Sequence, residues 1–273
     1  MSISIPQGRS ATATLSIIPR GSFSGSVTLE ATGLPPGVTA VFDPVTTSGG
    51  STMRLTVANS AAARTGTVTI SARAMGLSHS ITPTVTTTPV FSNTVAVNLS
   101  PAFNVSGIVA DGTKFAEADS IDAGGYSLSA QTLGQEQVGD EVVFRLGPQN
   151  APDAVTSRMV DLPAGRYSSL KILALAVDGN QTAQAFTVNY ADGTSSTSDQ
   201  SLHDWAESQN FTGESIAAEL QYRVAADGSE DSGPFYARAY SFKLDAGRQV
   251  RSISLPQNRN VVVLAMTLVP AAE

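Results

Sequence analysis

The stretch LPAGRYSSLKILALAVDGNQTAQAFTVNYADGT, residues 162–194, contains three apolar runs separated by Asp-Gly pairs at 178–179 and 192–193. Asp-Gly between apolar runs is a strong hairpin signal because both residues tolerate the positive φ that a tight turn requires. From Phe186 to Tyr190, apolar and polar residues alternate, which predicts a strand with one buried and one solvated face. Similar alternation recurs along the chain and predicts antiparallel β-structure throughout.

The composition of the chain allows two folded domains. It has 273 residues, of which 41% are hydrophobic, enough for two cores. Charged residues make up only 14%, and the formal net charge is −7. Nucleic-acid binding requires clustered Lys and Arg, so we expect no nucleic-acid partner.

Cysteine and long apolar runs are both absent from the sequence, which excludes several kinds of site and segment. The sequence contains no cysteine, which excludes disulfides and thiolate metal sites. It also lacks a run of 18 apolar residues, so we expect no membrane-spanning segment.

Residues 1–88 are expected to form the first domain. Short alternating stretches are separated by turn signals about every 8–12 residues, the spacing typical of a β-sandwich. The segment Gly33-Leu34-Pro35-Pro36-Gly37 cannot be helical because consecutive prolines lack amide donors and fix φ.

This first domain resembles a known repeat. GSFSGSVTLEATGLPPGVTAVFDP, residues 21–44, is similar to the bacterial immunoglobulin-like repeat that is often attached to secreted hydrolases. The resemblance covers nearly all of residues 1–88 and implies a seven-strand-type immunoglobulin-like sandwich that serves as a spacer.

A Thr/Pro-rich segment, residues 82–89, follows this domain. Its composition favours an extended, semi-rigid connection, although part of it can equally form the last strand of the first domain. We place a linker at residues 89–95.

Residues 96–273 are expected to form a larger sandwich of the jelly-roll type. The run VVVLAMTL, residues 261–268, is continuously apolar, which predicts a central strand with both faces covered. Residues 213–226 come closest to a helical period but fit a strand equally well.

This second unit also carries a resemblance. The segments IDAGGYSLSA (residues 121–130) and LHDW (residues 202–205) lie within a longer series of similar segments. The series is similar to a C-terminal module of secreted bacterial hydrolases, including glycoside hydrolases of the exo-α-mannosidase type. The resemblance implies a secreted setting, whereas the function of that module is poorly defined.

No catalytic centre is evident in the residues. The two histidines are His79 and His203, and a Ser-His-Asp hydrolase would have to use one of them. His203 is followed by Asp204, but neighbouring strand residues point to opposite faces and cannot form the required base–orienter bond. No G-x-S-x-G motif is present, and nothing selects a pair of carboxylates for glycoside hydrolysis. We therefore expect a protein that is not an enzyme.

Structural calcium is a candidate cofactor. Asp111, Asp119 and Asp122, together with backbone carbonyls of Gly-rich turns, offer the hard oxygen ligands that calcium prefers. The alternative is that these acidic residues stabilise turns through hydrogen bonds from their side chains to nearby backbone groups.

Aromatic residues point to the second unit as the place for a carbohydrate ligand. It contains the single tryptophan, Trp205, and all six tyrosines, whereas the first domain has neither. Sugars present apolar C–H faces to aromatic rings and hydroxyls to amides, carboxylates and arginine. Amide-rich loops at residues 180–182 and 257–260 add hydrogen-bonding groups.

Four residues are the candidates for carbohydrate binding. We expect Tyr222 with Arg223, and Tyr236 near the 227–234 loop, to be exposed. Trp205 is the fourth candidate, although a place in the core is the stronger interpretation for a lone tryptophan in a sandwich.

The sequence is thus interpreted as a non-catalytic accessory region of a secreted bacterial hydrolase, and as a piece of a longer precursor. Its expected partners are a polysaccharide or other glycan and the catalytic domain of the parent protein. Two alternatives stay open. The second unit either docks structurally on the catalytic domain, or it is a protein-binding or adhesion module of a secreted peptidase.

Overall fold

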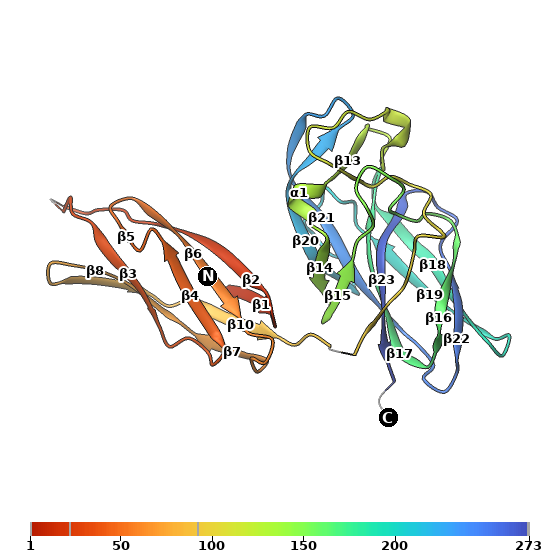
Figure 1. Ribbon diagram of the computed structural model, residues 1–273, viewed down its shortest axis with the longest axis horizontal. Helices are drawn as coiled ribbons and strands as arrows, with labels where there is room; N and C mark the ends of the chain where they lie inside the picture. Colours follow the sequence, from red (N-terminus) through yellow and green to blue (C-terminus); the bar gives the residue numbers. More distant parts are fainter. Residues whose placement is uncertain (1, 22, 92, 272–273) are drawn as a thin grey trace. The chain divides into compact units, whose positions relative to one another are not determined.

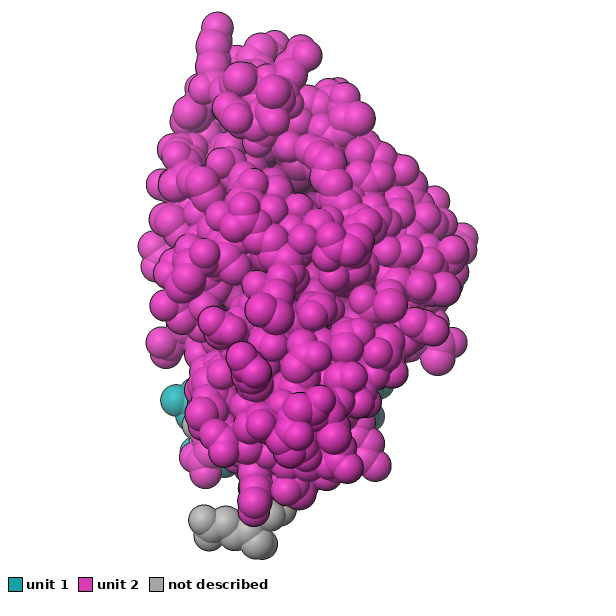
Figure 2. Space-filling view, turned by 90° about the vertical axis from the view of Figure 1, so that its right-hand side faces the viewer, with its two compact units in different colours: residues 1–90 teal, residues 91–273 magenta. Residues whose placement is uncertain are grey.

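A computed structural model describes residues 2–21, 23–91 and 93–271 of the chain. The chain divides into two compact units, residues 1–90 and 91–273 (Figure 2). The division lies within the segment 89–95 predicted as a linker. Residue 92 of that segment, and residues 1, 22, 272 and 273 of the two predicted domains, lie outside the described residues.

The first unit consists of three small sheets. Their strand orders are β1-β10-β7, β2-β6-β4 and β5-β3-β8-β9 (Figure 1). The strands are β1 (Ser2–Pro6), β2 (Ser10–Ser16), β3 (Val27–Thr32), β4 (Val38–Asp43), β5 (Thr46–Thr47), β6 (Gly50–Val57), β7 (Arg64–Thr67), β8 (Thr69–Ala74), β9 (Leu77–Ile81) and β10 (Thr84–Thr88).

One apolar core holds this unit together. On β6, Met53, Leu55 and Val57 are buried and alternate with exposed residues, as a strand with one covered face requires. In the loop before β4, Gly37 has φ +81°, and a Cβ there would lie 2.8 Å from the Cβ of Ala61. The GLPPG turn therefore requires glycine at this position.

The Thr/Pro-rich segment is a strand rather than a loose connection. Residues Thr84–Thr88 form β10, which pairs in parallel with β1 and antiparallel with β7. The hydroxyl of Thr87 donates to the carbonyl of Ala62 at 2.6 Å, and this bond attaches β10 to the segment before β7.

The second unit is built around a seven-stranded sheet with the order β11-β23-β17-β21-β20-β13-β12. A four-stranded sheet, β16-β22-β18-β19, and the β14–β15 hairpin complete it. The elements are β11 (Val95–Ala96), β12 (Ile108–Val109), the 3-10 turn η1 (Glu117–Asp119), β13 (Tyr126–Ser129), α1 (Ala130–Leu133), β14 (Glu136–Gly139), β15 (Val142–Arg145), β16 (Met159–Gly165), β17 (Tyr167–Ala176), β18 (Gln181–Tyr190), β19 (Ser195–Leu202), β20 (Glu214–Ala225), β21 (Glu230–Lys243), β22 (Val250–Ser254) and β23 (Val261–Pro270).

The central sheet is covered on both faces. Alternate residues of β17 enter two different cores: Ile172 packs with Phe186 and Ile253 of the four-stranded sheet, whereas Leu173 packs with Leu133 and Phe144 on the opposite side. Figure 1 shows the β14–β15 hairpin and α1 on one side of the sheet and the four-stranded sheet on the other. As predicted, β23 is covered on both faces, and all its residues from 261 to 269 are buried. The predicted central position is wrong: β23 is the second strand of the sheet, next to the two-residue strand β11.

The all-β sandwich prediction is confirmed. Chain segments cross between the sheets from β16 to β17, β17 to β18 and β21 to β22, as in a jelly roll. In contrast, β18 and β19 form a hairpin within one sheet. Both Asp-Gly turns lie where the sequence predicts, between β17 and β18 and between β18 and β19. Only the second closes a hairpin; the hairpin predicted at 178–179 is wrong, because that turn leads from the seven-stranded sheet to the four-stranded sheet. The ambiguous segment 213–226 contains β20. Among the described residues, no helix is long and apolar enough to cross a membrane.

Candidate functional site

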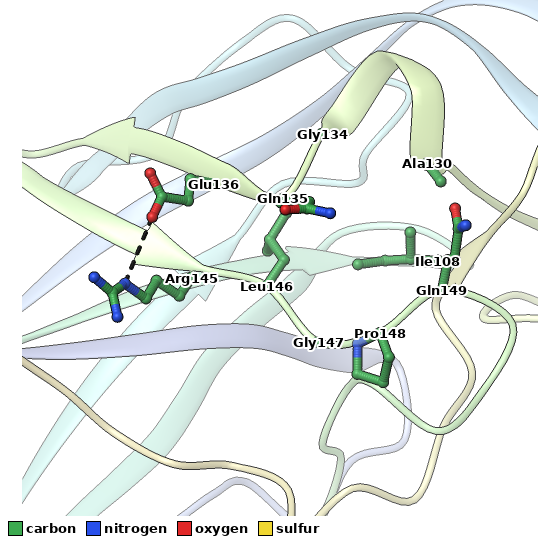
Figure 3. A pocket seen from close by; sticks show the side chains of 10 residues that line it. All are labelled: Ile108, Ala130, Gly134, Gln135, Glu136, Arg145, Leu146, Gly147, Pro148 and Gln149. Carbon is green, nitrogen blue, oxygen red and sulfur yellow. Dashed lines mark ion pairs between the residues drawn. The ribbon is translucent and has the colours of Figure 1, made fainter. Parts of the chain in front are cut away.

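An open depression of about 660 Å³ lies on the second unit, next to the β14–β15 hairpin (Figure 3). Three segments distant in sequence form its walls: β12, the turn from α1 into β14, and the loop after β15. The lining residues are Ile108, Ala130, Gly134, Gln135, Glu136, Arg145, Leu146, Gly147, Pro148 and Gln149.

The lining combines amides with apolar surface. Figure 3 shows Gln135 and Gln149 on opposite sides of the depression, with Ile108 between them and Leu146 next to Gln135. Both glutamines are exposed, and within the described residues neither side-chain amide has a recorded hydrogen-bond partner. The depression thus offers two amides above an apolar floor.

An ion pair lies at the edge of the depression. Arg145 Nε lies 3.5 Å from Glu136 Oε1 across the β14–β15 hairpin, and the two side chains are 73% and 40% exposed. At such exposure the pair adds little to stability. Its donors and acceptors therefore remain accessible to a ligand.

A buried carboxylate holds two walls of the depression together. The Asp153 side chain is fully buried and accepts hydrogen bonds from the backbone N–H groups of Gly107 at 2.8 Å and Ile108 at 2.9 Å. Burial raises the pKa of the Asp153 carboxyl to about 7, against the lowering effect of the two N–H donors. A Cβ on Gly147 would lie 2.7 Å from the Asp153 Cβ, so only glycine allows this packing.

A hydroxyl–carboxylate cluster supports the start of α1. The Ser129 hydroxyl accepts from the Thr132 N–H as a helix N-cap and donates to Asp111 Oδ1 at 2.7 Å. The Tyr222 hydroxyl donates to Asp111 Oδ2 at 2.6 Å. Two of the residues that the sequence singled out, Asp111 and Tyr222, therefore meet directly beside Ala130 of the depression.

Arg223 is held in place by its neighbours. Its guanidinium lies 3.5 Å from the centre of the Tyr126 ring and donates from Nε to Asp231 at 2.8 Å. It also donates to Asp122 at 3.4 Å. Burial raises the pKa of Asp122, while the Tyr126 N–H and the Arg223 charge oppose that shift. Arg223 thus serves mainly to tie β20 to the loop before β13.

The expected exposure of Tyr236 is wrong, and Trp205 is a core residue. Tyr236 lies on β21 and is 6% exposed, and Trp205 is 2% exposed and packs on Phe235 with ring centroids 5.2 Å apart. Neither ring can stack on a sugar. The four predicted carbohydrate-binding residues therefore do not form one cleft, and only Tyr222 and Arg223 retain partial exposure.

His203 is enclosed in a buried network. Its Nδ1 lies 2.9 Å from Glu214 Oε2, and its ring stacks on Phe211 at 3.7 Å between centroids. Glu214 also accepts from the Tyr240 hydroxyl at 2.9 Å. Burial, followed by the Glu214 charge, raises the pKa of Tyr240 well above its ordinary value.

Arg238 completes this network and anchors the loop that follows β19. It is fully buried, and its Nε lies 3.8 Å from Glu214 and donates to Asn210 at 3.1 Å. Its terminal nitrogens donate to the backbone carbonyls of Asp204, Glu207 and Gln209. One side chain thus fixes much of the segment between β19 and β20.

The comparison with protein families identifies the second unit. Residues 93–272 match the model of the AziU2-like beta-sandwich domain. The chain belongs to this family. We refer to the second unit below as the AziU2-like unit.

Solved structures show only distant similarity. Domains 5–6 of the S-layer protein SbsC align with 99% of this chain and 94% of their own, at 11% identity and a TM-score of 0.26. The endo-fucoidan hydrolase MfFcnA4 of glycoside hydrolase family 107 aligns at 14% identity and a TM-score of 0.24, over 98% of this chain and 42% of its own. The CupB2 chaperone of Pseudomonas aeruginosa aligns at 11% identity and a TM-score of 0.24, over 89% and 97%. No curated protein matches.

The three acidic residues proposed for calcium do not form a ligand set. In the AziU2-like unit, Asp111 binds Ser129 and Tyr222, Asp122 binds Arg223, and Asp119 lies in η1. Within the described residues, no three His, Cys, Asp or Glu side chains gather as a metal-binding group. The calcium hypothesis therefore gains no support from their placement.

The sequence reasoning missed Gln135 and Gln149. The amide-rich loops that it singled out use their side chains internally: Asn180 accepts from the Asp204 N–H, and Asn258 donates to Gln181. Gln135 and Gln149 flank the β14–β15 hairpin on both sides. The glycines at 134 and 147, which indicate turns close to these two glutamines, were the sequence feature that could have identified them as exposed.

Proposed function

We propose that the AziU2-like unit binds carbohydrate in the depression lined by Gln135 and Gln149. The observation that carries this proposal is the pair of exposed amides in a depression that is also lined by the accessible apolar side chains of Leu146 and Pro148. A sugar ring has the matching chemistry, because its hydroxyls bond to amides while its C–H faces pack on apolar side chains. The volume of about 660 Å³ is within the usual range for small-ligand sites.

In this proposal the protein is a non-catalytic accessory region of a secreted bacterial hydrolase, and its immunoglobulin-like first unit is a spacer. The resemblance of residues 121–130 and 202–205 to modules of such hydrolases supports the setting. A catalytic role for His203 is disfavoured, because its ring is buried between Phe211 and Glu214.

Structural docking on a catalytic domain is the less favoured function. A docking face requires a contiguous apolar patch. The exposed large hydrophobic residues among the described part of the AziU2-like unit are Phe91, Met159 and Ile216, which belong to the segment before β11 and to strands of two different sheets. They therefore do not support an apolar face.

Affinity electrophoresis of the whole chain across a panel of soluble polysaccharides tests the proposal. We expect at least one polymer to retard the protein. Loss of two amide contacts, at about 1 kcal/mol each, predicts binding about tenfold weaker or more in the double variant Gln135→Ala/Gln149→Ala. The matched control is Gln257→Ala, which removes an exposed glutamine outside the depression. Absence of retardation would favour the docking function instead, whereas equal retardation of all three proteins would mean that carbohydrate binds outside the depression.

A further inference from the structure

The first unit has an edge strand with unusual exposure. β9, Leu77–Ile81, pairs only with β8 and ends the sheet β5-β3-β8-β9. All five of its residues are exposed, including Leu77 at 62% and Ile81 at 42%. Its outer backbone donors and acceptors therefore face solvent, and they are a template for another strand.

This edge lacks the usual features that prevent strand addition. The strand LSHSI contains no Lys, Arg, Asp, Glu or Pro, and its pairing with β8 runs without a bulge from Leu77 to Ile81. Two other edges of the same unit have such features: β5 has only two residues, and β7 begins with Arg64. Short length and charge are common ways in which an edge avoids pairing.

The sequence of β9 is self-complementary in an antiparallel arrangement. If two copies pair about His79, Leu77 of one lies opposite Ile81 of the other, and Ser78 lies opposite Ser80. Leu77, His79 and Ile81 share one face of the strand because side chains alternate. Each apolar residue thus gains an apolar cross-strand neighbour, and each serine gains a hydroxyl neighbour.

We propose that β9 is a self-association edge, which pairs antiparallel with β9 of a second copy of this chain about a two-fold axis at His79. The two four-stranded sheets then continue into one sheet of eight strands. Such an isologous contact closes on itself and leaves no further β9 edge exposed. A contact of five residues on each side is small, so we expect weak association that a covalent link can capture.

Single-cysteine variants test the proposal, because the natural chain has no cysteine. In His79→Cys, the two thiols lie directly opposite each other, with Cα atoms about 4.5–5.5 Å apart, within the range of a disulfide. In Leu77→Cys alone, the thiols lie four residues out of register, about 13 Å apart. A mixture of Leu77→Cys and Ile81→Cys again places thiols opposite each other.

The readout is covalent dimer on a non-reducing gel after mild oxidation at micromolar protein concentration. We expect His79→Cys, and the Leu77→Cys/Ile81→Cys mixture, to cross-link at least about tenfold faster than Leu77→Cys alone, because the paired state raises the effective thiol concentration. Equal rates for all three, or no dimer from His79→Cys, would overturn the proposal.

Charged substitutions at Ser78 and Ser80, on the other face of β9, distinguish cross-linking in the proposed register from cross-linking by random collision. In the His79→Cys background, Ser78→Lys/Ser80→Lys places lysines opposite each other across the interface and is expected to suppress cross-linking. Ser78→Glu/Ser80→Lys instead places glutamate opposite lysine and is expected to restore it. If both double variants cross-link equally, the register is wrong. Far-UV circular dichroism confirms that every variant is folded before oxidation.

Discussion

The two units of the chain differ in the kinds of polar side chain that they bury. Among the described residues of the first unit, the buried polar side chains are the hydroxyls of Ser51, Ser71 and Thr87. The AziU2-like unit buries ionisable groups as well, namely Asp122, Asp153, Lys171, His203, Glu214 and Arg238. A single apolar core is enough for the small sandwich, whereas the larger one adds polar anchors.

The difference follows from the number of layers. In the first unit the sheets enclose one core. In the AziU2-like unit the central sheet has a core on each face, so irregular segments such as 203–213 and 147–154 must lie against buried strands. Their backbone groups lose contact with water and need internal partners. Arg238 supplies donors for carbonyls of the segment 203–213, whereas Asp153, itself in the segment 147–154, accepts from the N–H groups of Gly107 and Ile108.

The largest expected effect is that of Arg238→Met. The change removes the Arg238 charge from the buried Glu214 carboxylate and leaves several backbone carbonyls without their donor. We expect the AziU2-like unit to lose about 3–5 kcal/mol of unfolding free energy. Urea denaturation followed by Trp205 fluorescence measures it selectively, because the first unit has neither Trp nor Tyr.

Arg251→Met is the matched control for this change, since Arg251 is exposed on β22. We expect its effect to stay within about 0.5 kcal/mol. If the two variants have the same urea midpoint, the buried network around Arg238 adds no more to the unfolding free energy than an exposed arginine does. The contrast between the two units would then not extend to their stability.

A pH-dependent effect is expected at Asp153. The folded pKa of about 7 lies above the usual value of 3.8, so the folded state binds the proton more tightly. The resulting stabilisation is complete below about pH 4 and is lost as the pH rises to about 7. At about 1.4 kcal/mol per pKa unit, the loss is at most about 4 kcal/mol.

Asp153→Asn removes this titration. Across pH 4–8, we expect the stability of the wild-type AziU2-like unit to fall relative to Asp153→Asn, as followed by Trp205 fluorescence in urea. Asp199→Asn, at an exposed position on β19, should remain parallel to the wild type. Parallel curves for Asp153→Asn as well would show that burial of this carboxyl does not shift its titration.

The smallest expected effect is at the surface of the same unit. Arg248 pairs with Asp245 at 3.1 Å and Asp192 at 3.7 Å, with all three side chains about half exposed. We expect Arg248→Ala to cost less than about 1 kcal/mol, and high salt to abolish most of the difference. A cost comparable to that of Arg238→Met would mean that burial is not what separates strong from weak ion pairs here.

The fold was largely predictable from local pattern. The Asp-Gly pair at 192–193 defines the β18–β19 hairpin because its backbone requirement is local, and the continuous apolar run in β23 requires cover on both faces. The pair at 178–179 is a turn at the predicted place, but the hairpin predicted there is wrong, because β17 and β18 belong to different sheets. The segment 213–226 was ambiguous because its periodicity fits either structure. Pairing with β13 and β21, a tertiary effect, makes it a strand.

The site was predictable only in part, since exposure depends on which layer covers a strand. Trp205 packs in the core that the central sheet shares with α1 and the β14–β15 hairpin, a third layer that a two-sheet expectation does not contain. The depression joins residue 108 to segments 130–136 and 145–149, and no local pattern reports that juxtaposition. Asp111 and Tyr222 were selected for separate roles, and tertiary structure brings them together in one hydrogen bond.

The parallel pairing of β1 with β10 has a mechanical consequence for the first unit. Ser2 pairs with Thr84 and Pro6 with Thr88, so the strand that enters the unit and the strand that leaves it run side by side in the same direction. Tension applied at the two ends of the unit pulls these strands in opposite directions along their length. The hydrogen bonds between them are then loaded together in shear rather than opened one after another, which suits a segment that transmits force between its neighbours.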